Sequence, residues 1–369
     1  MNSTPPSRLT INLDAIAANW RLLDARHPGQ TAGVVKANAY GLGATYVAPK
    51  LFAAGCKHFF TAHLAEALTI RPLVGQAQVM VLHGVLPGEA EIFVQHDITP
   101  VLSSLPEVAL WGAAAKRLGR RLPAFLQIDT GMSRLGLSFE EIERLFNNPD
   151  WLTGINIIYV MTHLMNAEIA EHPSNAAQYQ RISQFQRQFQ AQFPDMKLSL
   201  ANSSGLFLAP QFASDLARPG AALYGINPTP GQANPLHPVV ALHGKIIALR
   251  DIKPGTEVGY NGVWAAQRPS RIATVAVGYA DGYFRSLTNR ACGYFDGTPA
   301  PLVGRVSMDL TTFDVTEIAN LNLGDSLELL GPHCTPDDLA RAANTNGYEV
   351  LTALGARYER HYIGAVPAT

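Results

Sequence analysis

The sequence has only three cysteines, Cys56, Cys292 and Cys334, among its 369 residues. They stand far apart and follow no spacing that is typical of metal ligands, so they predict neither a disulfide framework nor a metal site. We interpret them as free thiols of a protein in a reducing compartment, and the location that we expect is the cytoplasm.

Long apolar runs and basic clusters are also missing. No apolar stretch approaches the ~18 residues of a membrane span, and the opening residues MNSTPPSRLTINLD contain no apolar core of a secretion signal. The net charge is −1, and no basic run is interleaved with aromatic residues, as it commonly is in nucleic-acid-binding proteins. We therefore expect neither a membrane nor a nucleic acid among the partners.

Charged residues are scarce, at 15% of the chain against ~25% in an average soluble domain. Hydrophobic residues make up 47%. This balance indicates much buried surface, part of which can lie between subunits. The length fits two domains, or one barrel with an appendage.

Helical and strand-like periodicities alternate over the first 220 residues. We expect strands at 32–37, 58–62, 79–84, 99–104, 123–130, 155–163, 197–203 and 215–220. We expect helices at 13–25, 45–55, 65–74, 88–96, 105–119, 138–148, 172–193 and 206–213. Eight repeated units of this kind predict an α/β fold in which a parallel sheet closes into a TIM-like (β/α)8 barrel. An open, doubly wound sheet is the alternative, because periodicity does not demonstrate closure.

The character of the sequence changes at NPTPGQANPLHP (227–238), which predicts a linker. Alternating, β-branched runs follow and are separated by turn dipeptides, which predicts a mostly antiparallel C-terminal β domain with one helix near 335–344. The strand-like segment RLTINL (8–13) has no place in the barrel. We therefore predict a barrel domain over 12–230 and a β domain over 231–369 that also includes residues 1–11.

Polar residues stand at the C-terminal ends of the predicted barrel strands, where active sites of such barrels form. Lys36 ends the apolar first strand in VVKANAYGLG, where an ammonium group is costly to bury unless it is paired or used. Arg134, His163, Ser203 and Arg218 follow later strands. Each alone has a structural explanation, such as an exposed charge or a turn serine, but together they predict one site.

Two small-residue turns follow the seventh and eighth strands, Ser203-Ser204-Gly205 and Pro219-Gly220-Ala221. Free N–H groups at such turns bind anions, and barrels commonly bind phosphate at this place. With a strand-end lysine opposite, the pattern suits a phosphorylated aldehyde that is held as a Schiff base. Pyridoxal 5′-phosphate (PLP) is the obvious candidate.

Eight segments resemble the motif set of the alanine racemase family, in order and with matching spacing from about residue 8 to about residue 360. They are VVKANAYGLG, DTGMSRLG, MTHLMNAE, ANSSG, ARPGAALYG, GYNGVW, VGYADGY and GRVSMDL. The resemblance implies a PLP-dependent isomerase, a homodimer with shared active sites that interconverts L-alanine and D-alanine. It implies D-alanine supply for peptidoglycan or alanine catabolism, and the sequence does not decide between these roles.

The resemblance also implies roles for individual residues. Lys36 would hold PLP as an internal aldimine and, after an external aldimine forms with alanine, act as one catalytic base. Tyr260 would be the second base, and Met308 and Arg134 would bind the substrate; Tyr260 and Met308 would come from the partner subunit. The other residues implied to bind the cofactor are Tyr40, Arg134, His163, Ser203, Arg218, Gly220, Ala221 and Tyr348.

The chemistry of racemisation accounts for these residue types. A proton leaves Cα on one face and another returns on the opposite face, so two bases must flank the substrate. Lysine and tyrosine have ordinary pKa values near ~10, and both must be lowered for work near neutral pH. His163 could link Tyr260 to Arg218. Arg218 beside the pyridine nitrogen stays protonated and donates a hydrogen bond, which disfavours transamination.

Two positions depart from the family pattern. Many members have a lysine, whose carbamate pairs with the rim arginine, where this sequence has Gln127; we expect its neutral amide to hold Arg134 instead. Members often have a histidine where this sequence has Ser199, which affects a contact to Arg218.

Three other functions are compatible with parts of the pattern. A racemase of serine or another small amino acid would share the motifs, because the side-chain pocket is not readable from them. A fold-related PLP decarboxylase would place an acidic residue where Arg218 stands. A non-catalytic PLP-binding protein would have no use for Tyr260.

Overall fold

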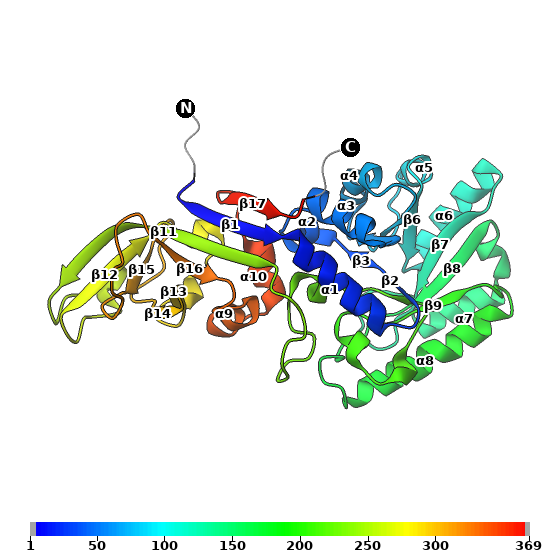
Figure 1. Cartoon of the computed structure of the whole chain (residues 1–369). Coiled ribbons are helices and arrows are strands. Elements are labelled where there is room, and N and C mark those ends of the chain that lie inside the picture. The colour runs from blue at the N-terminus through cyan, green and yellow to red at the C-terminus, as the bar shows by residue number, and fades with distance from the viewer. Residues whose placement is uncertain (1–4, 366–369) are drawn as a thin grey trace. The chain divides into compact units, whose positions relative to one another are not determined.

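The computed structural model describes residues 5–365; residues 1–4 and 366–369, at the two ends of the predicted β domain, lie outside the described residues. The chain divides into two compact units, and Figure 1 labels most of their helices and strands. We call Ile16–Ala39 with Gly43–Leu236 the barrel unit, and residues 5–15, Tyr40–Leu42 and His237–Ala365 the β unit. The inclusion of Tyr40–Leu42 in the β unit was not predicted.

The barrel unit is built on a parallel sheet. Its strands are β2 (Gln30–Thr31), β3 (Gly33–Val34), β4 (His58–Thr61), β5 (Gln78–Val81), β6 (Ile98–Leu102), β7 (Leu122–Gln127), β8 (Ile155–Met161), β9 (Lys197–Ser199) and β10 (Leu216–Ala217). Their order is β2-β10-β9-β8-β7-β6-β5-β4-β3, and every pairing is parallel.

The first predicted strand closes this sheet. Of the predicted range 32–37, only β3 (33–34) is a strand; β2 (30–31) precedes it across Ala32, and Lys36 already begins a turn. β2 pairs with β10 and β3 pairs with β4, so together they close the sheet. Between the two strands, Ala32 N donates to Ala217 O at 2.9 Å, and within β3, Val34 N donates to Pro219 O at 3.1 Å. The sheet is therefore a barrel, and the predicted fold class is confirmed over the open-sheet alternative.

Helices follow the strands and lie outside them, as Figure 1 shows for α6, α7 and α8. The helices are α1 (Leu13–Arg26), α3 (Ala44–Ala54), α4 (Leu64–Ile70), α5 (Ala90–Gln95), α6 (Leu105–Leu118), α7 (Phe139–Asn147) and α8 (Pro173–Gln190). The start of α7 is fixed by a reciprocal cap, since the Ser138 hydroxyl accepts from Glu141 N at 3.2 Å and the Glu141 carboxylate accepts from Ser138 N at 2.9 Å.

The predicted helix at 206–213 is wrong. The segment forms two short 3₁₀ turns, η3 (Ser204–Phe207) and η4 (Pro210–Phe212). Pro210 explains the interruption, because a proline has no N–H for helical bonding and pushes the preceding residue towards an extended backbone. Ala209 accordingly has φ −59° and ψ 155°.

The β unit contains a mostly antiparallel sheet, as predicted. Its strands are β1 (Ser7–Asn12), β11 (Val240–Ile252), β12 (Ser270–Val275), β13 (Cys292–Phe295), β14 (Thr298–Pro301), β15 (Thr311–Asp314), β16 (Ser326–Leu330) and β17 (Glu359–Ile363). The main order is β14-β13-β16-β11-β1-β17, and β12 pairs with β11 and β15. Only the β1–β17 pairing among these described strands is parallel.

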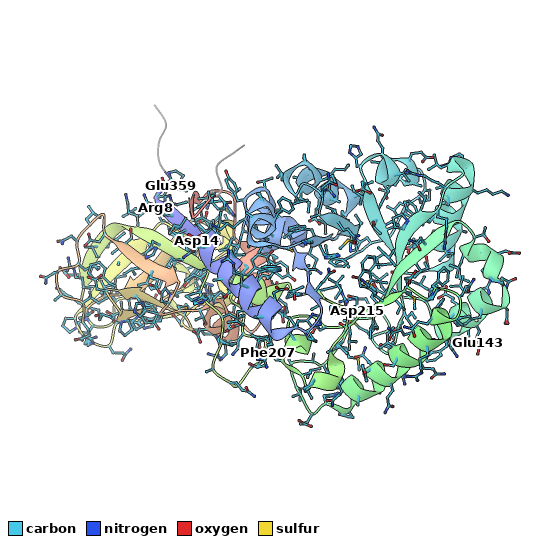
Figure 2. All side chains as sticks on the ribbon, turned by 45° about the vertical axis from the view of Figure 1, so that its right-hand side comes forward. Arg8, Asp14, Glu143, Phe207, Asp215 and Glu359 are labelled. Carbon is cyan, nitrogen blue, oxygen red and sulfur yellow. The ribbon has the colours of Figure 1, made fainter. Side chains whose placement is uncertain are left out.

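The N-terminal strand β1 lies inside this sheet, between β11 and β17. Figure 2 shows Arg8 of β1 beside Glu359 of β17, and their side chains form an ion pair at 3.1 Å. Two helices belong to the same unit: α9 (Pro336–Ala343), which was predicted, and α10 (Gly347–Ala353), which was not. Over residues 5–365, no helix combines the length and apolarity that a membrane crossing needs.

Candidate active site

Lys36 follows β3 and begins a left-handed turn, labelled α2 (Lys36–Tyr40). Four successive residues, 37–40, have φ between 51° and 55°. None of them is glycine, so each bears a conformational cost of ~1–2 kcal/mol. The turn persists because its surroundings hold it: Ala39 N donates to Val35 O at 2.8 Å, and the Asn38 carboxamide oxygen accepts from Ala44 N at 2.8 Å.

The Glu66 carboxylate fastens this turn to the end of β4. One of its oxygens accepts from Ala37 N at 2.7 Å, and the other accepts from Ala62 N at 2.8 Å and from His63 N at 3.4 Å. Burial lowers the pKa of the Lys36 amine, and the positive charge of Arg134 lowers it further, against the opposing effect of Glu66. Lys36 therefore loses its proton more readily than an ordinary lysine.

His163, which follows β8, is neutral at physiological pH. Burial lowers its pKa to about 3, and the positive charges of Arg218, Arg134 and Lys36 act in the same direction. Lys36, Arg134, His163 and Arg218 all follow the C-terminal ends of barrel strands, and the three cations act on His163 electrostatically. The structure thus brings together the cations and the imidazole that the sequence distributes over four strands.

Arg218 is held rigidly after β10. One guanidinium nitrogen, Nη1, donates to the Ser199 hydroxyl at 2.6 Å, and the other, Nη2, donates to Thr162 O at 2.6 Å. Ser199, one of the two positions that depart from the family pattern, therefore does contact Arg218. Burial lowers the pKa of Arg218 to about 10, so the guanidinium is still a cation and a donor at neutral pH.

The two turns expected to bind phosphate are joined by Ser203. Its hydroxyl oxygen accepts from the backbone N–H groups of Gly220 and Ala222, each at 3.1 Å. Ser203 is buried, and because its oxygen already accepts two hydrogen bonds, its O–H group can still donate one. Ala221 begins the 3₁₀ turn η5 (Ala221–Tyr224), so Ser203, Gly220 and Ala221 form one small-residue cradle.

Arg134 lies in an exposed loop after β7. The Asp129 carboxylate shapes the start of this loop by accepting three successive backbone N–H groups, of residues 131–133, at 2.8–3.1 Å. Gln127 does not hold the Arg134 guanidinium as expected. Its amide donates instead to Leu135 O at 3.2 Å, so it fixes the backbone next to Arg134.

The remaining predicted site residues belong to the β unit. Tyr260, in the turn η6 (Tyr260–Gly262), is 69% exposed, and Met308 is 54% exposed. Tyr40 is grouped with the same unit, where burial raises its pKa to about 12, and Tyr348 lies in α10.

The backbone around Met308 is tightly fixed. Met308 O accepts from Ala280 N at 2.9 Å. The next residue, Asp309, pairs with Arg357 at 2.8 Å, and the same guanidinium pairs with the buried Asp281 at 2.7 Å. Sequence reasoning missed these ion pairs and the Glu66 clamp. Only Glu66 had a readable signal, a glutamate in the first turn of α4.

A closed parallel barrel that carries a depressed-pKa lysine, a neutral histidine and two arginines at its rim, in a chain with an antiparallel β unit, defines the class of barrel-type amino-acid racemases. The family profile "Alanine racemase, N-terminal domain" matches residues 11–228, and "Alanine racemase, C-terminal domain" matches residues 239–362. The chain belongs to the alanine racemase family, whose members are PLP-dependent isomerases.

Individual relatives match over nearly their full length. The alanine racemase of Acidiphilium cryptum is 53% identical over 95% of this chain and 97% of its own, and that of Brucella canis is 46% identical over 96% and 93%. The crystal structure of alanine racemase from Bartonella henselae with covalently bound pyridoxal phosphate has a TM-score of 0.92 at 40% identity, covering 98% of this chain and all of that one.

Proposed function

We propose that this chain is an alanine racemase that holds PLP on Lys36 and uses Lys36 and Tyr260 as its two catalytic bases. The observation that carries the proposal is the lowered pKa of Lys36 within a group of neutral His163 and cationic Arg134 and Arg218. The membership of the chain in the family and the PLP-bound Bartonella relative support the same function.

The residues of the barrel unit fit this cofactor. A half-buried amine of low pKa suits a Schiff base to an aldehyde. The cradle of Ser203, Gly220 and Ala221 would take the phosphate, together with Tyr40 and Tyr348. Arg218 would donate to the pyridine nitrogen, and Arg134 would lie by the phenolic oxygen. When bound, PLP withdraws electrons from the amino-acid Cα and so makes its proton acidic.

The residues of the chain then move the protons. Lys36 would take the Cα proton of D-alanine, and Tyr260 would take that of L-alanine from the opposite face. Neutral His163 would accept a hydrogen bond from Arg218 on one ring nitrogen and donate one to the Tyr260 oxygen from the other, which would link the phenol to the buried cation. The backbone of Met308 and the side chain of Arg134 would bind the alanine carboxylate.

We further propose a homodimer in which Tyr260 and Met308 complete the partner's site. Both side chains are more than half exposed within one chain, as residues that act on a neighbouring molecule would be. In this arrangement, residues 12–230 form the PLP-binding domain, and 231–369 with 1–11 form the domain that reaches the partner. A cytoplasmic enzyme of this kind would supply D-alanine for peptidoglycan or take part in alanine catabolism.

Deuterium exchange tests the two-base proposal. Tyr260→Phe removes the phenolic oxygen and should lower racemisation by ~10²–10⁴-fold in both directions. The variant should still wash deuterium into D-alanine through Lys36, while exchange into L-alanine nearly stops. Tyr294→Phe, in β13, is the matched control and should behave as wild type. Equal residual exchange into both enantiomers would mean that a single base serves both faces.

Two further measurements complete the test. Borohydride reduction should abolish the cofactor absorbance and label the Lys36 peptide; a label on another lysine would contradict the assignment. Mixed Lys36→Ala and Tyr260→Phe chains should regain activity if subunits exchange and sites are shared, and full activity in a stable monomer would rule that out. A racemisation assay over alanine, serine and other small amino acids tests the substrate.

A further inference from the structure

A pair of histidines at the same end of the barrel has no role in the proposed reaction. His63 follows β4 and His83 follows β5, and their Nδ1 atoms lie 3.2 Å apart. The rings are nearly perpendicular, at 87°, with centroids 4.5 Å apart. The backbone fixes this proximity, because β4 and β5 pair in register and His83 N donates to Ala62 O at 3.1 Å. Both side chains are exposed.

The two Nδ1 atoms lie at hydrogen-bond distance, and the same separation also fits two ligands on one metal ion. Imidazole nitrogens bind Zn²⁺ at ~2.0–2.1 Å, which places two of them ~3.3 Å apart at a tetrahedral angle and ~2.9 Å apart at a right angle. The observed 3.2 Å lies between these values. A single cation could therefore contact both nitrogens with little movement of either side chain.

The charges around the pair also permit a cation. A histidine binds metal only as the neutral imidazole. Partial burial lowers the pKa of His83, and the charges that His63 and Lys36 carry when protonated lower it further, so this ring loses its proton more readily than an ordinary imidazole. The Glu66 carboxylate opposes these charges and lies beside the pair, since it accepts from His63 N. Glu66 thus acts on His83 in the opposite direction to Lys36.

We propose that His63 and His83 chelate one borderline transition-metal cation, of the Zn²⁺, Ni²⁺ or Cu²⁺ class, at the barrel rim near Lys36. Residues 5–365 contain no cluster of three or more histidine, cysteine or carboxylate side chains placed to hold a metal. The site is therefore an open one, with two protein ligands and water, from which metal exchanges. Hard cations such as Mg²⁺ and Ca²⁺ prefer oxygen ligands and should not bind there.

A bound cation would affect the neighbouring amine. The charges of His83 and Lys36 already influence each other, so a divalent ion on His83 would further disfavour the protonated Lys36. The bound cation would then inhibit racemisation or shift its pH profile, and this consequence rests on the proposed function. Metal binding itself does not, so its measurement is independent of whether the chain racemises alanine.

Equilibrium dialysis of the purified holoenzyme against ZnCl₂ and NiCl₂ at pH 7.5 tests the site. Wild type should bind one ion per chain at His63 and His83, and His63→Gln and His83→Gln should each lose it. His96→Gln, at another exposed histidine of the barrel unit, should keep it. Unchanged stoichiometry in both histidine variants, or equal uptake of MgCl₂, would overturn the proposal.

A second measurement needs no variant. The electron paramagnetic resonance spectrum of wild-type holoenzyme with one equivalent of CuCl₂ should show hyperfine coupling to two imidazole nitrogens. The coupling should disappear as the pH falls and protons compete with copper for the rings. Coupling to one nitrogen or to none would contradict a two-histidine chelate, even if the substituted proteins do not fold.

Discussion

The Glu66 clamp should determine how well Lys36 is positioned, and Glu66→Gln isolates its contribution. Each oxygen of the carboxylate accepts backbone N–H groups, Ala37 N on one and Ala62 N with His63 N on the other. Glutamine keeps the size of the side chain but has only one acceptor oxygen. The NH₂ group of glutamine would therefore face a backbone N–H group where Glu66 has an acceptor oxygen, and at least one hydrogen bond would be lost. The negative charge would be lost as well.

The expected magnitude follows from the contacts. The left-handed residues 37–40 together hold ~4–8 kcal/mol of backbone strain that the surroundings must offset. A hydrogen bond to a charged group is worth ~1.5–3 kcal/mol, and the substitution removes at least one. If all of this lost hydrogen-bond energy appears as poorer positioning of Lys36 in the transition state, kcat/KM for alanine should decrease by roughly 10- to 150-fold.

The pH dependence provides a second, independent signature. The charge of Glu66 raises the pKa of Lys36, in opposition to burial and Arg134. Its removal should therefore lower that pKa. In the direction in which Lys36 acts as a base, from D-alanine to L-alanine, the limb of the kcat/KM profile that rises with pH should move to lower pH in Glu66→Gln.

A matched control separates positioning from general stability. Glu107 occupies the equivalent place in the first turn of α6, where its carboxylate accepts from Ser103 N, but it is no cause of the pKa shift of Lys36. Glu107→Gln should lower thermal stability and leave the pH profile in place. If both variants lose the same activity, or if the profile of Glu66→Gln does not move, the clamp does not position Lys36.

Two predictions concern the β unit. Arg357→Gln should raise KM for alanine more than it lowers kcat, because the guanidinium anchors Asp309 beside the proposed substrate-binding Met308. Arg357→Lys keeps the positive charge and should retain more of the affinity for alanine. An unchanged KM in both variants would contradict this prediction. Gly282→Ala should lower the melting temperature far more than Gly324→Ala. Both glycines have positive φ, 88° and 92°, so the backbone cost of alanine is similar at the two positions. A Cβ at residue 282 would lie 2.0 Å from Ala353 O, whereas a Cβ at residue 324 would have no atom within 4 Å. Equal melting temperatures of the two variants would show that the backbone at Ala353 moves to make room for the added methyl group.

The barrel could be predicted because its signal is repeated. Because strand-like and helical periodicity alternate eight times, the prediction of a barrel stays correct even if one of the elements is predicted wrongly. The failed helix at 206–213 shows such an error, since apolar spacing outweighed the one proline at its centre. Helix α10 was missed for the opposite reason: it is seven residues long and begins with glycine, and only Asn346, whose side chain accepts from Glu349 N, marks its start.

The site was predictable where a residue stands at a strand end, because the strand order fixes which end of the barrel it reaches. The contacts of the site were not predictable where they depend on an unusual backbone conformation. VVKANAY contains no glycine before Gly41, so nothing in it announces a left-handed turn. The N–H groups that Glu66 binds come together only because that turn exists, and the Gln127 amide reaches a backbone carbonyl for a similar reason.

The last prediction concerns His58, at the start of β4 and so at the other end of the strand from the histidine pair. Its ring is 7% exposed and lies edge-on to Tyr159, with centroids 6.5 Å apart. Burial, helped by the charges of Lys197 and Lys57, lowers the pKa of His58 to about 4. In the unfolded chain the pKa is the ordinary ~6.5.

The sign of the effect follows from proton binding. Between pH 6.5 and 4 the unfolded chain holds a proton on this ring and the folded chain does not, so the free energy of unfolding falls as the pH falls. The slope is ~1.4 kcal/mol per pH unit, or about 2 kcal/mol between pH 6.5 and pH 5. His58→Gln removes the titrating group, so urea unfolding at fixed protein concentration should lose about 2 kcal/mol less between pH 7 and pH 5 than wild type. His96→Gln, at an exposed histidine, should keep the wild-type slope. Parallel losses in wild type and His58→Gln would mean that the His58 ring is protonated in the folded protein as readily as in the unfolded chain.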